Sequence, residues 1–217
     1  MAFGAVFDCD GTLLDSMEAW HIVQCDLAER AGIGSTDDLT TELGPMTIPE
    51  VGAYLHAKYG LGADADDVVS MIDEGMLEYY RNRAVPRVGA LEFVKKLNEL
   101  GVNCSVASSS PQSYLQAGLR KTGFMPYLDA VVSVDDVGAS KREPAVFNQA
   151  CKLMGTRIAE TWGFEDSLYA LQTLKRAGYR AVGLYDNDLA GTFEELAAVA
   201  DIAVRSFDEL DARIFAR

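Results

Sequence analysis

The residues best suited to chemistry lie near the N-terminus, where Asp8 follows the apolar run AVF and Asp10 stands two positions further on. Residues two apart in an extended segment point the same way, so both carboxylates can face one site. Two negative charges at the end of a buried strand destabilise the fold unless a positive charge lies close to them. The pair therefore indicates a site that binds a cation.

Three further polar groups stand at places that could face the same site. Residues 108–110 are serines that end the run VNCSVA, Lys141 lies in the loop GASKREP, and Glu165 and Asp166 follow TWGF. Each of these groups also has a structural explanation that needs no role in a site. A serine before proline can cap a helix, and a lysine in a loop is usually solvated. Acids at the start of a helix interact favourably with its dipole. Ligands of open α/β sheets bind outside the carboxyl ends of the strands, where we expect the four groups to converge.

The converging groups would supply carboxylates, hydroxyls and one lysine. Mg²⁺ is a hard cation that prefers oxygen ligands and keeps several waters, so one or two carboxylates, a backbone carbonyl and a substrate phosphate would complete its octahedron. Hydroxyls and free backbone N–H groups at a helix start suit an anion. The residue types therefore predict Mg²⁺ as the cation at this site.

The pattern of apolar residues predicts the elements that position these groups. After residue 86, strand-like and helix-like runs alternate, which is typical of a parallel, doubly wound sheet. Between residues 17 and 82 the apolar positions recur at helical spacing and we find no strand. The expected fold is α/β: a Rossmann-like parallel-sheet core of residues 1–16 and 83–217 with an inserted α-helical cap of residues 17–82.

The individual elements can be placed to within a few residues. Strands are expected within residues 4–8, 102–110, 130–137, 159–167, 181–186 and 201–206. Helices are expected within residues 17–32, 47–60, 64–84, 90–101, 112–124, 144–155, 168–178 and 192–200.

Composition narrows the class of protein. The 217 residues, 49% apolar and 24% charged, suit a globular core with a smaller insert. The net charge of −14 repels nucleic acid and anionic membranes, so a phosphorylated substrate would need local positive charge from a metal or a lysine. No apolar run is long enough to span a membrane, and no leader is evident. We expect a cytoplasmic monomer or small homo-oligomer that acts on a small phosphorylated metabolite.

The motifs occur in an order that identifies a family. DxDGTLLDS, a strand ending in ASSS, SKxxPxxF and FEDS together resemble the haloacid dehalogenase superfamily, and more narrowly its phosphatase and beta-phosphoglucomutase branch with a helical cap. The resemblance covers essentially the whole chain. It implies that Asp8 is a nucleophile that forms an aspartyl-phosphate, and that Asp10 is the general acid and base. Asp10 also argues for phosphoryl transfer, because the dehalogenases lack an aspartate there.

The resemblance also assigns the phosphate and metal contacts. Gly11, Ser108 and the amide of Ser109 would bind the phosphate, and Lys141 would neutralise charge between the nucleophile and the phosphate. Mg²⁺ would be held by Asp8, the backbone carbonyl of Asp10, Asp166, and Glu165 either directly or through water. In the cap, Met17, Glu18 and His21 would lie over the mouth of the site and become the candidate specificity residues.

Two departures from the family pattern bear on the reaction. The lysine motif reads KREP at residues 141–144 where relatives often read KPxP, which predicts only local loop differences. Beta-phosphoglucomutases carry an arginine in the first cap loop, but the comparable residues 44–47 read GPMT. The leading hypothesis is therefore a Mg²⁺-dependent phosphatase of small phosphomonoesters. The alternatives are a beta-phosphoglucomutase-type isomerase and a non-catalytic phosphate-binding protein.

Overall fold

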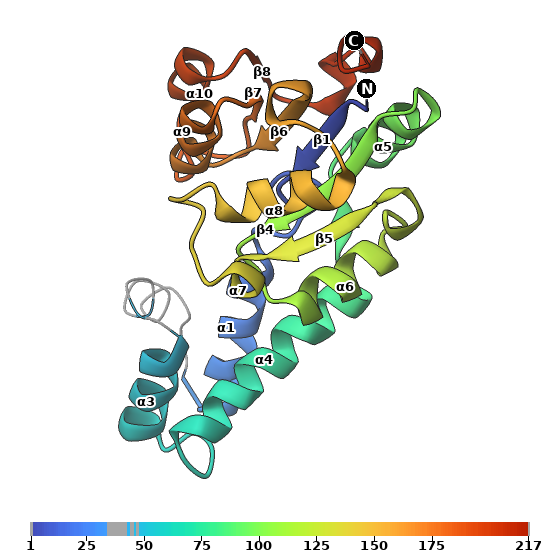
Figure 1. Ribbon diagram of the computed structural model, residues 1–217. Helices are drawn as coiled ribbons and strands as arrows, with labels where there is room; N and C mark the ends of the chain where they lie inside the picture. The colour runs from blue at the N-terminus through green and yellow to red at the C-terminus, as the bar shows by residue number, and fades with distance from the viewer. Residues whose placement is uncertain (1, 34–42, 44–45, 47, 217) are drawn as a thin grey trace. The chain divides into compact units, whose positions relative to one another are not determined.

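The structure is a computed structural model that describes residues 2–33, 43, 46 and 48–216. The chain divides into two compact units, shown in Figure 1. The core unit consists of Met1–Ser16 and Ala84–Arg217, and the helical unit consists of Met17–Arg83. Within the described residues, no helix combines the length and the apolar character that a membrane crossing needs.

A six-stranded parallel sheet forms the centre of the core unit, in the strand order β5-β4-β1-β6-β7-β8. The register places Phe7, the last residue of β1, beside Val106 and Phe164, so the carboxyl ends of these three parallel strands lie at one edge of the sheet. This edge carries the polar groups that the sequence singled out. The strands are β1 (Gly4–Phe7), β4 (Asn103–Ser108), β5 (Ala130–Ser133), β6 (Thr161–Glu165), β7 (Arg180–Leu184) and β8 (Ile202–Val204).

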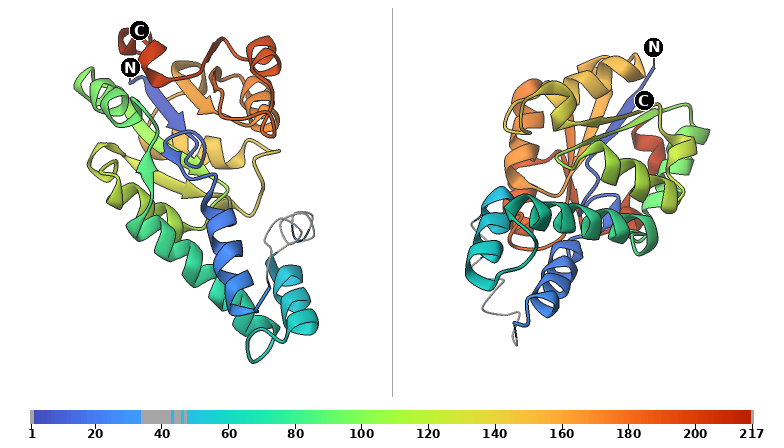
Figure 2. Two further views of the ribbon diagram at one scale, coloured as in Figure 1. Left: turned by 180° about the vertical axis from the view of Figure 1, so that it is seen from behind. Right: turned by 90° about the horizontal axis from the view of Figure 1, so that it is seen from below.

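Helices cover both faces of this sheet, as Figures 1 and 2 show. Successive residues of a strand point to opposite faces, so Val6 joins an aliphatic core under one layer while Phe7 joins an aromatic core under the other. In the aromatic core Phe7 stacks on Phe164 with ring centroids 4.4 Å apart. The helices are α5 (Ala90–Glu99), α6 (Gln112–Lys121), α8 (Ala145–Met154), α9 (Leu168–Ala177) and α10 (Phe193–Val199).

The helical unit is formed by α1 (Ala19–Arg30), α3 (Ile48–Tyr59) and α4 (Ala65–Asn82), and its described residues contain no strand. Asp64 starts α4 by accepting a hydrogen bond from the N–H of Asp67 at 2.8 Å. The helical unit has an apolar core of its own, which includes Val23, Leu55 and Ile72. The structure thus confirms the predicted doubly wound α/β fold with a helical insertion.

The structure departs in places from the elements expected from the sequence. The strand expected through residue 137 ends at Ser133, and α7 (Val134–Val137) follows. Ser133 starts this helix because its Oγ accepts from the N–H of Asp135 at 3.2 Å and its own N–H donates to Asp136 Oδ2 at 2.8 Å. A short antiparallel pair, β2 (Leu14–Asp15) with β3 (Val85–Pro86), was not expected. Two-residue strands leave no periodic signal in a sequence.

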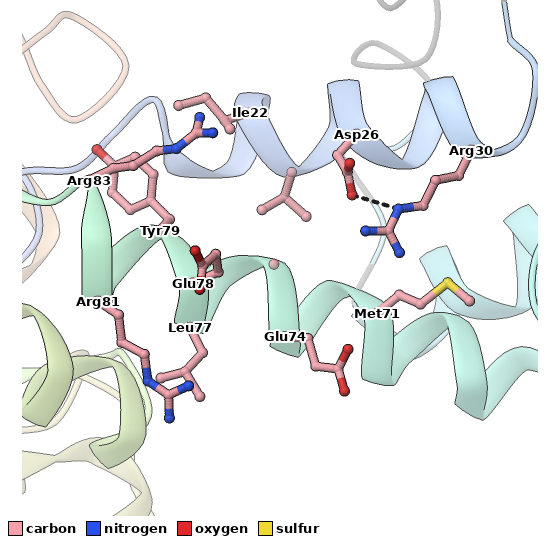
Figure 3. Close-up of a pocket in the computed structure, with 12 residues that line it drawn as sticks. Ile22, Asp26, Arg30, Met71, Glu74, Leu77, Glu78, Tyr79, Arg81 and Arg83 are labelled. Atoms are coloured by element: carbon pink, nitrogen blue, oxygen red, sulfur yellow. Dashed lines mark ion pairs between the residues drawn. The ribbon is translucent and has the colours of Figure 1, made fainter.

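A groove of about 540 Å³ lies within the helical unit, between α1 and α4. Figure 3 shows residues of both charges along it, with Arg30 paired to Asp26 through Nε and Oδ2 at 2.8 Å. Because Glu74 and Glu78 also line it, the groove does not select for an anionic ligand.

Candidate active site

Three segments far apart in the sequence meet at the carboxyl edge of the sheet. Asp8 follows β1 and is held by a hydrogen bond from its N–H to the carbonyl of Phe164 at 2.9 Å. The Lys141 side chain is 3% exposed, and its Nζ donates to Asp8 Oδ1 and, at 2.6 Å, to Glu165 Oε1. The explanation that Lys141 is an ordinary solvated lysine of a loop is therefore wrong, because its side chain is buried between two carboxylates.

Asp8, Glu165 and Asp166 form a buried acidic cluster. Each can offer a carboxylate oxygen within 4.8 Å of the others. Thr12 reaches the same cluster from the first motif, where its Oγ1 lies 3.4 Å from Asp166 Oδ1. With all groups ionised, three negative charges face the single positive charge of Lys141. The cluster therefore needs further positive charge or a proton.

Burial is the largest single influence on the pKa values of Asp8, Asp166 and Lys141. It raises the pKa of Asp8 well above its ordinary value, reinforced by Glu165 and Asp166 and opposed by Lys141. Burial, and then the charge of Glu165, raises the pKa of Asp166 to about 7. For Lys141, burial would lower the pKa, but the charges of Asp8 and Glu165 and the hydrogen bonds to them outweigh it and raise the pKa. Lys141 therefore carries its positive charge at neutral pH.

The donor set fits a hard divalent cation. Its side-chain atoms are carboxylate oxygens, which Mg²⁺ and similar ions prefer over nitrogen or sulfur. Their burial excludes the water that would otherwise screen mutual repulsion. Asp8, Asp166 and Glu165 are the residues of this cluster that would hold such an ion.

Asp10 is held by two hydroxyl groups. Ser16 Oγ donates to its Oδ1 and Ser110 Oγ donates to its Oδ2, both at 2.6 Å. The alternative that Ser110 caps the next helix is wrong, because α6 begins after Pro111 and has no side-chain cap. The contact of Ser16 with Asp10 could have been predicted, because both residues belong to the first motif. The contact of Ser110 with Asp10 joins residues 100 positions apart and could not be predicted from the local sequence.

The remaining predicted phosphate contacts line the same edge of the core unit. Ser108 is buried and its Oγ accepts from the N–H of Ser110 at 3.0 Å, while Ser109 is exposed. Gly11 has a φ of 79°, a left-handed conformation that favours glycine. The sequence reasoning missed Tyr169, whose hydroxyl lies within electrostatic reach of Glu165 and Lys141. Burial and the charge of Glu165 raise the pKa of Tyr169.

The candidate specificity residues belong to the other unit. Met17, Glu18 and His21 lie at the start of the helical unit, where all three are exposed. His21 Nε2 lies 3.6 Å from Cys25 Sγ on the next turn of α1. Of the residues 44–47 that replace the arginine loop of the mutases, only Met46 is described, and the others lie outside the described residues. The roles of these residues toward a substrate stay predictions.

The acidic cluster predicts how pH affects chelator-treated protein. Because the pKa of Asp166 is raised to about 7 in the fold, the folded state binds a proton that the unfolded chain releases at a lower pH. The free energy of unfolding should therefore rise as the pH falls from about 8 to about 5, and this rise should be smaller in Asp166→Asn. Urea unfolding across this range measures both slopes, and equal slopes would contradict the assignment.

Comparison with known proteins places the site in a family. A family model described as haloacid dehalogenase-like hydrolase matches residues 4–178. The chain therefore belongs to the haloacid dehalogenase-like hydrolases. This confirms the resemblance carried by the four sequence motifs, which lie within the matched range.

The relatives of this hydrolase include phosphatases whose sequences align with most of this chain. It is 28% identical over 210 residues to validoxylamine A 7'-phosphate phosphatase of Streptomyces hygroscopicus subsp. limoneus, covering 95% of this chain and 94% of the relative. It is 24% identical over 211 residues to hexitol phosphatase B of Escherichia coli (strain K12), covering 96% and 94%. The family and these relatives support the predicted enzyme class, a phosphoric monoester hydrolase.

A solved structure shows the same fold. A protein provisionally named beta-phosphoglucomutase, from Thermotoga maritima, superposes with a TM-score of 0.83 at 21% identity, covering 96% of each chain. At that identity the likeness supports the α/β fold and leaves the choice between hydrolase and mutase to the residues.

Proposed function

We propose that this hydrolase is a Mg²⁺-dependent phosphatase that cleaves small phosphomonoesters through an aspartyl-phosphate on Asp8. The observation that carries the proposal is the buried Lys141 ammonium, which bridges Asp8 and Glu165 beside Asp166. This arrangement supplies a carboxylate nucleophile, a fixed cation for the incoming phosphate and an acidic cluster for a metal.

In the first step an Asp8 carboxylate oxygen forms a bond to phosphorus while the bond from phosphorus to the ester oxygen breaks. Asp10, in its protonated form, gives its proton to the departing oxygen. In the second step Asp10 takes a proton from water, whose oxygen attacks phosphorus and releases phosphate and the Asp8 carboxylate. Ser16 and Ser110 orient the Asp10 carboxyl group for both transfers through their hydrogen bonds of 2.6 Å.

The other residues manage charge around the phosphate. Lys141 lies on the Asp8 oxygen and lowers the repulsion between two anions. Ser108, Gly11 and the amide of Ser109 would bind the phosphate oxygens. Bound Mg²⁺, held by Asp8, Asp166, the Asp10 carbonyl and Glu165, would supply electrostatic stabilisation of the negative charge that develops on the transferring phosphoryl group.

For the substrate we propose the phosphate ester of a small polyhydroxylated compound. The hexitol phosphatase relative supports a polyol phosphate, and it aligns along 96% of this chain. The cap residues 44–47 read GPMT, so this stretch of the sequence carries no arginine that could hold a second phosphate. We therefore expect weak binding of bisphosphates, whose second phosphate needs its own cation.

The experiment that tests this function is phosphate release from a panel of hexitol phosphates, hexose mono- and bisphosphates, nucleotides and a chromogenic phosphomonoester. It is run with Mg²⁺ and with EDTA. Metal-dependent release, greatest for polyol or sugar monophosphates, supports the proposal. Interconversion of hexose phosphates without release, followed by ³¹P NMR, would instead support the mutase alternative.

A further inference from the structure

Arg87 makes an unusual set of contacts directly after β3, where the chain returns to the core unit. Its N–H donates to the carbonyl of Leu13 at 2.9 Å, and its Nη1 donates to the carbonyl of Gly11. Its Nη2 donates to the carbonyl of Tyr185 at 3.0 Å. One arginine thus joins the turn of the first motif to the loop after β7.

Asp186 completes the arrangement by pairing with Arg87 Nη1 at 2.9 Å. The two side chains are only 15% and 18% exposed, so solvent screens this pair much less than the surface pair of Arg213 with Asp211. Arg87 therefore neutralises the Asp186 carboxylate while it holds the turn of the first motif.

The turn that Arg87 holds carries the backbone of Asp10. The N–H of Gly11 donates to the carbonyl of Leu14 at 2.9 Å, and because a trans peptide is planar, the Asp10 carbonyl points the opposite way. Arg87 fixes the two neighbouring carbonyls, those of Gly11 and Leu13. It therefore restrains the peptide whose carbonyl is assigned to the metal.

We propose that Arg87, with Asp186, is a positioning residue that holds the turn of residues 10–13 in the geometry that the metal and phosphate require. The inference rests on the proposed function for its effect on turnover, but its effect on Mg²⁺ binding can be measured without a substrate. A guanidinium group is required, because a lysine ammonium lacks the planar fork that reaches two carbonyls and a carboxylate at once.

The test compares Arg87→Ala, Arg87→Lys and the control Arg213→Ala, which removes an exposed arginine that also pairs with an aspartate. Mg²⁺ alone is titrated by calorimetry, and kcat and KM are measured on the best panel substrate. We expect Arg87→Ala to lose about 10- to 100-fold in Mg²⁺ affinity and kcat, with little change in KM. Arg87→Lys should recover only part of this loss, and the control should behave as wild type.

Chemical rescue separates positioning from a general loss of stability. Arg87 and Asp186 line a cavity of about 380 Å³, so a guanidinium ion can enter the space that Arg87→Ala leaves. Millimolar guanidinium should restore Mg²⁺ binding and kcat of this variant, whereas tetramethylammonium, which has no donors, should not. If Arg87→Ala does not fold, Arg87→Lys decides the question.

The outcomes separate this inference from the proposed function. Wild-type Mg²⁺ affinity and kcat in Arg87→Lys and Arg87→Ala, or a loss without guanidinium rescue that follows the melting temperature, would overturn the positioning role. If the wild-type protein releases no phosphate but Arg87→Ala still weakens Mg²⁺ binding, the proposed function fails and the positioning role stands.

Discussion

Replacement of Asp8 by Asn should remove phosphatase activity without unfolding the protein. An amide is not a nucleophile toward phosphorus, so we expect kcat to fall by a factor on the order of 10⁴ or more. The fold should not suffer, because burial raises the pKa of Asp8 and the ionised carboxylate therefore destabilises the native state at neutral pH. In EDTA, Asp8→Asn should melt at the wild-type temperature or above it.

The measurement pairs phosphate release with thermal unfolding on the same samples. Asp135→Asn is the matched control, because Asp135 is an exposed aspartate of the core unit. Mass spectrometry of an acid-quenched reaction should find a phosphorylated peptide containing Asp8 in the wild type and none in Asp8→Asn. Turnover near the wild-type rate in Asp8→Asn would exclude Asp8 as the nucleophile.

The sequence predicted the sheet and the meeting point of the site because both depend on strong local signals. The run before Asp8 and the run before Glu165 are short and apolar, as interior strands of a parallel sheet are, and both are followed by acids. The carboxyl ends of the strands of a parallel sheet lie at the same edge. The meeting of these acids could therefore be predicted without knowing any contact between distant residues. In the structure Lys141 contacts both Asp8 and Glu165 at this edge.

What the sequence could not predict are contacts that depend on the exact path of loops. Arg87 and Asp186 are separated by 99 positions, and neither belongs to a recognisable motif. The bond from Ser110 to Asp10 spans 100 positions, and a serine before proline has a local explanation that competes with it. The prediction of strand for residues 134–137 was wrong for a related reason. Ser133 and Asp136 form a capping box that starts a helix, and this outweighs the strand tendency of the two valines.

Lys141 offers a second variant with a large expected effect, this time on both stability and activity. Lys141→Met leaves Asp8 and Glu165 buried without their cation, and breaking such a pair costs about 3–5 kcal/mol, or roughly 10 °C in melting temperature. The surface lysine Lys175, paired to Asp201, is the matched control, and Lys175→Met should cost less than about 1 kcal/mol. Activity of Lys141→Met should fall on the order of 10²–10³-fold.

The double variant Lys141→Met with Glu165→Gln separates the two effects. Removing the Glu165 charge relieves the repulsion that Lys141→Met creates, so part of the lost melting temperature should return. Turnover should stay low, because no ammonium remains on the Asp8 carboxylate. Recovery of both quantities would mean that Lys141 only stabilises the cluster. Glu165→Gln alone, which removes a residue assigned to the metal, sets the baseline for turnover. Recovered stability together with turnover well below that baseline would identify Lys141 as the residue that lets two anions react.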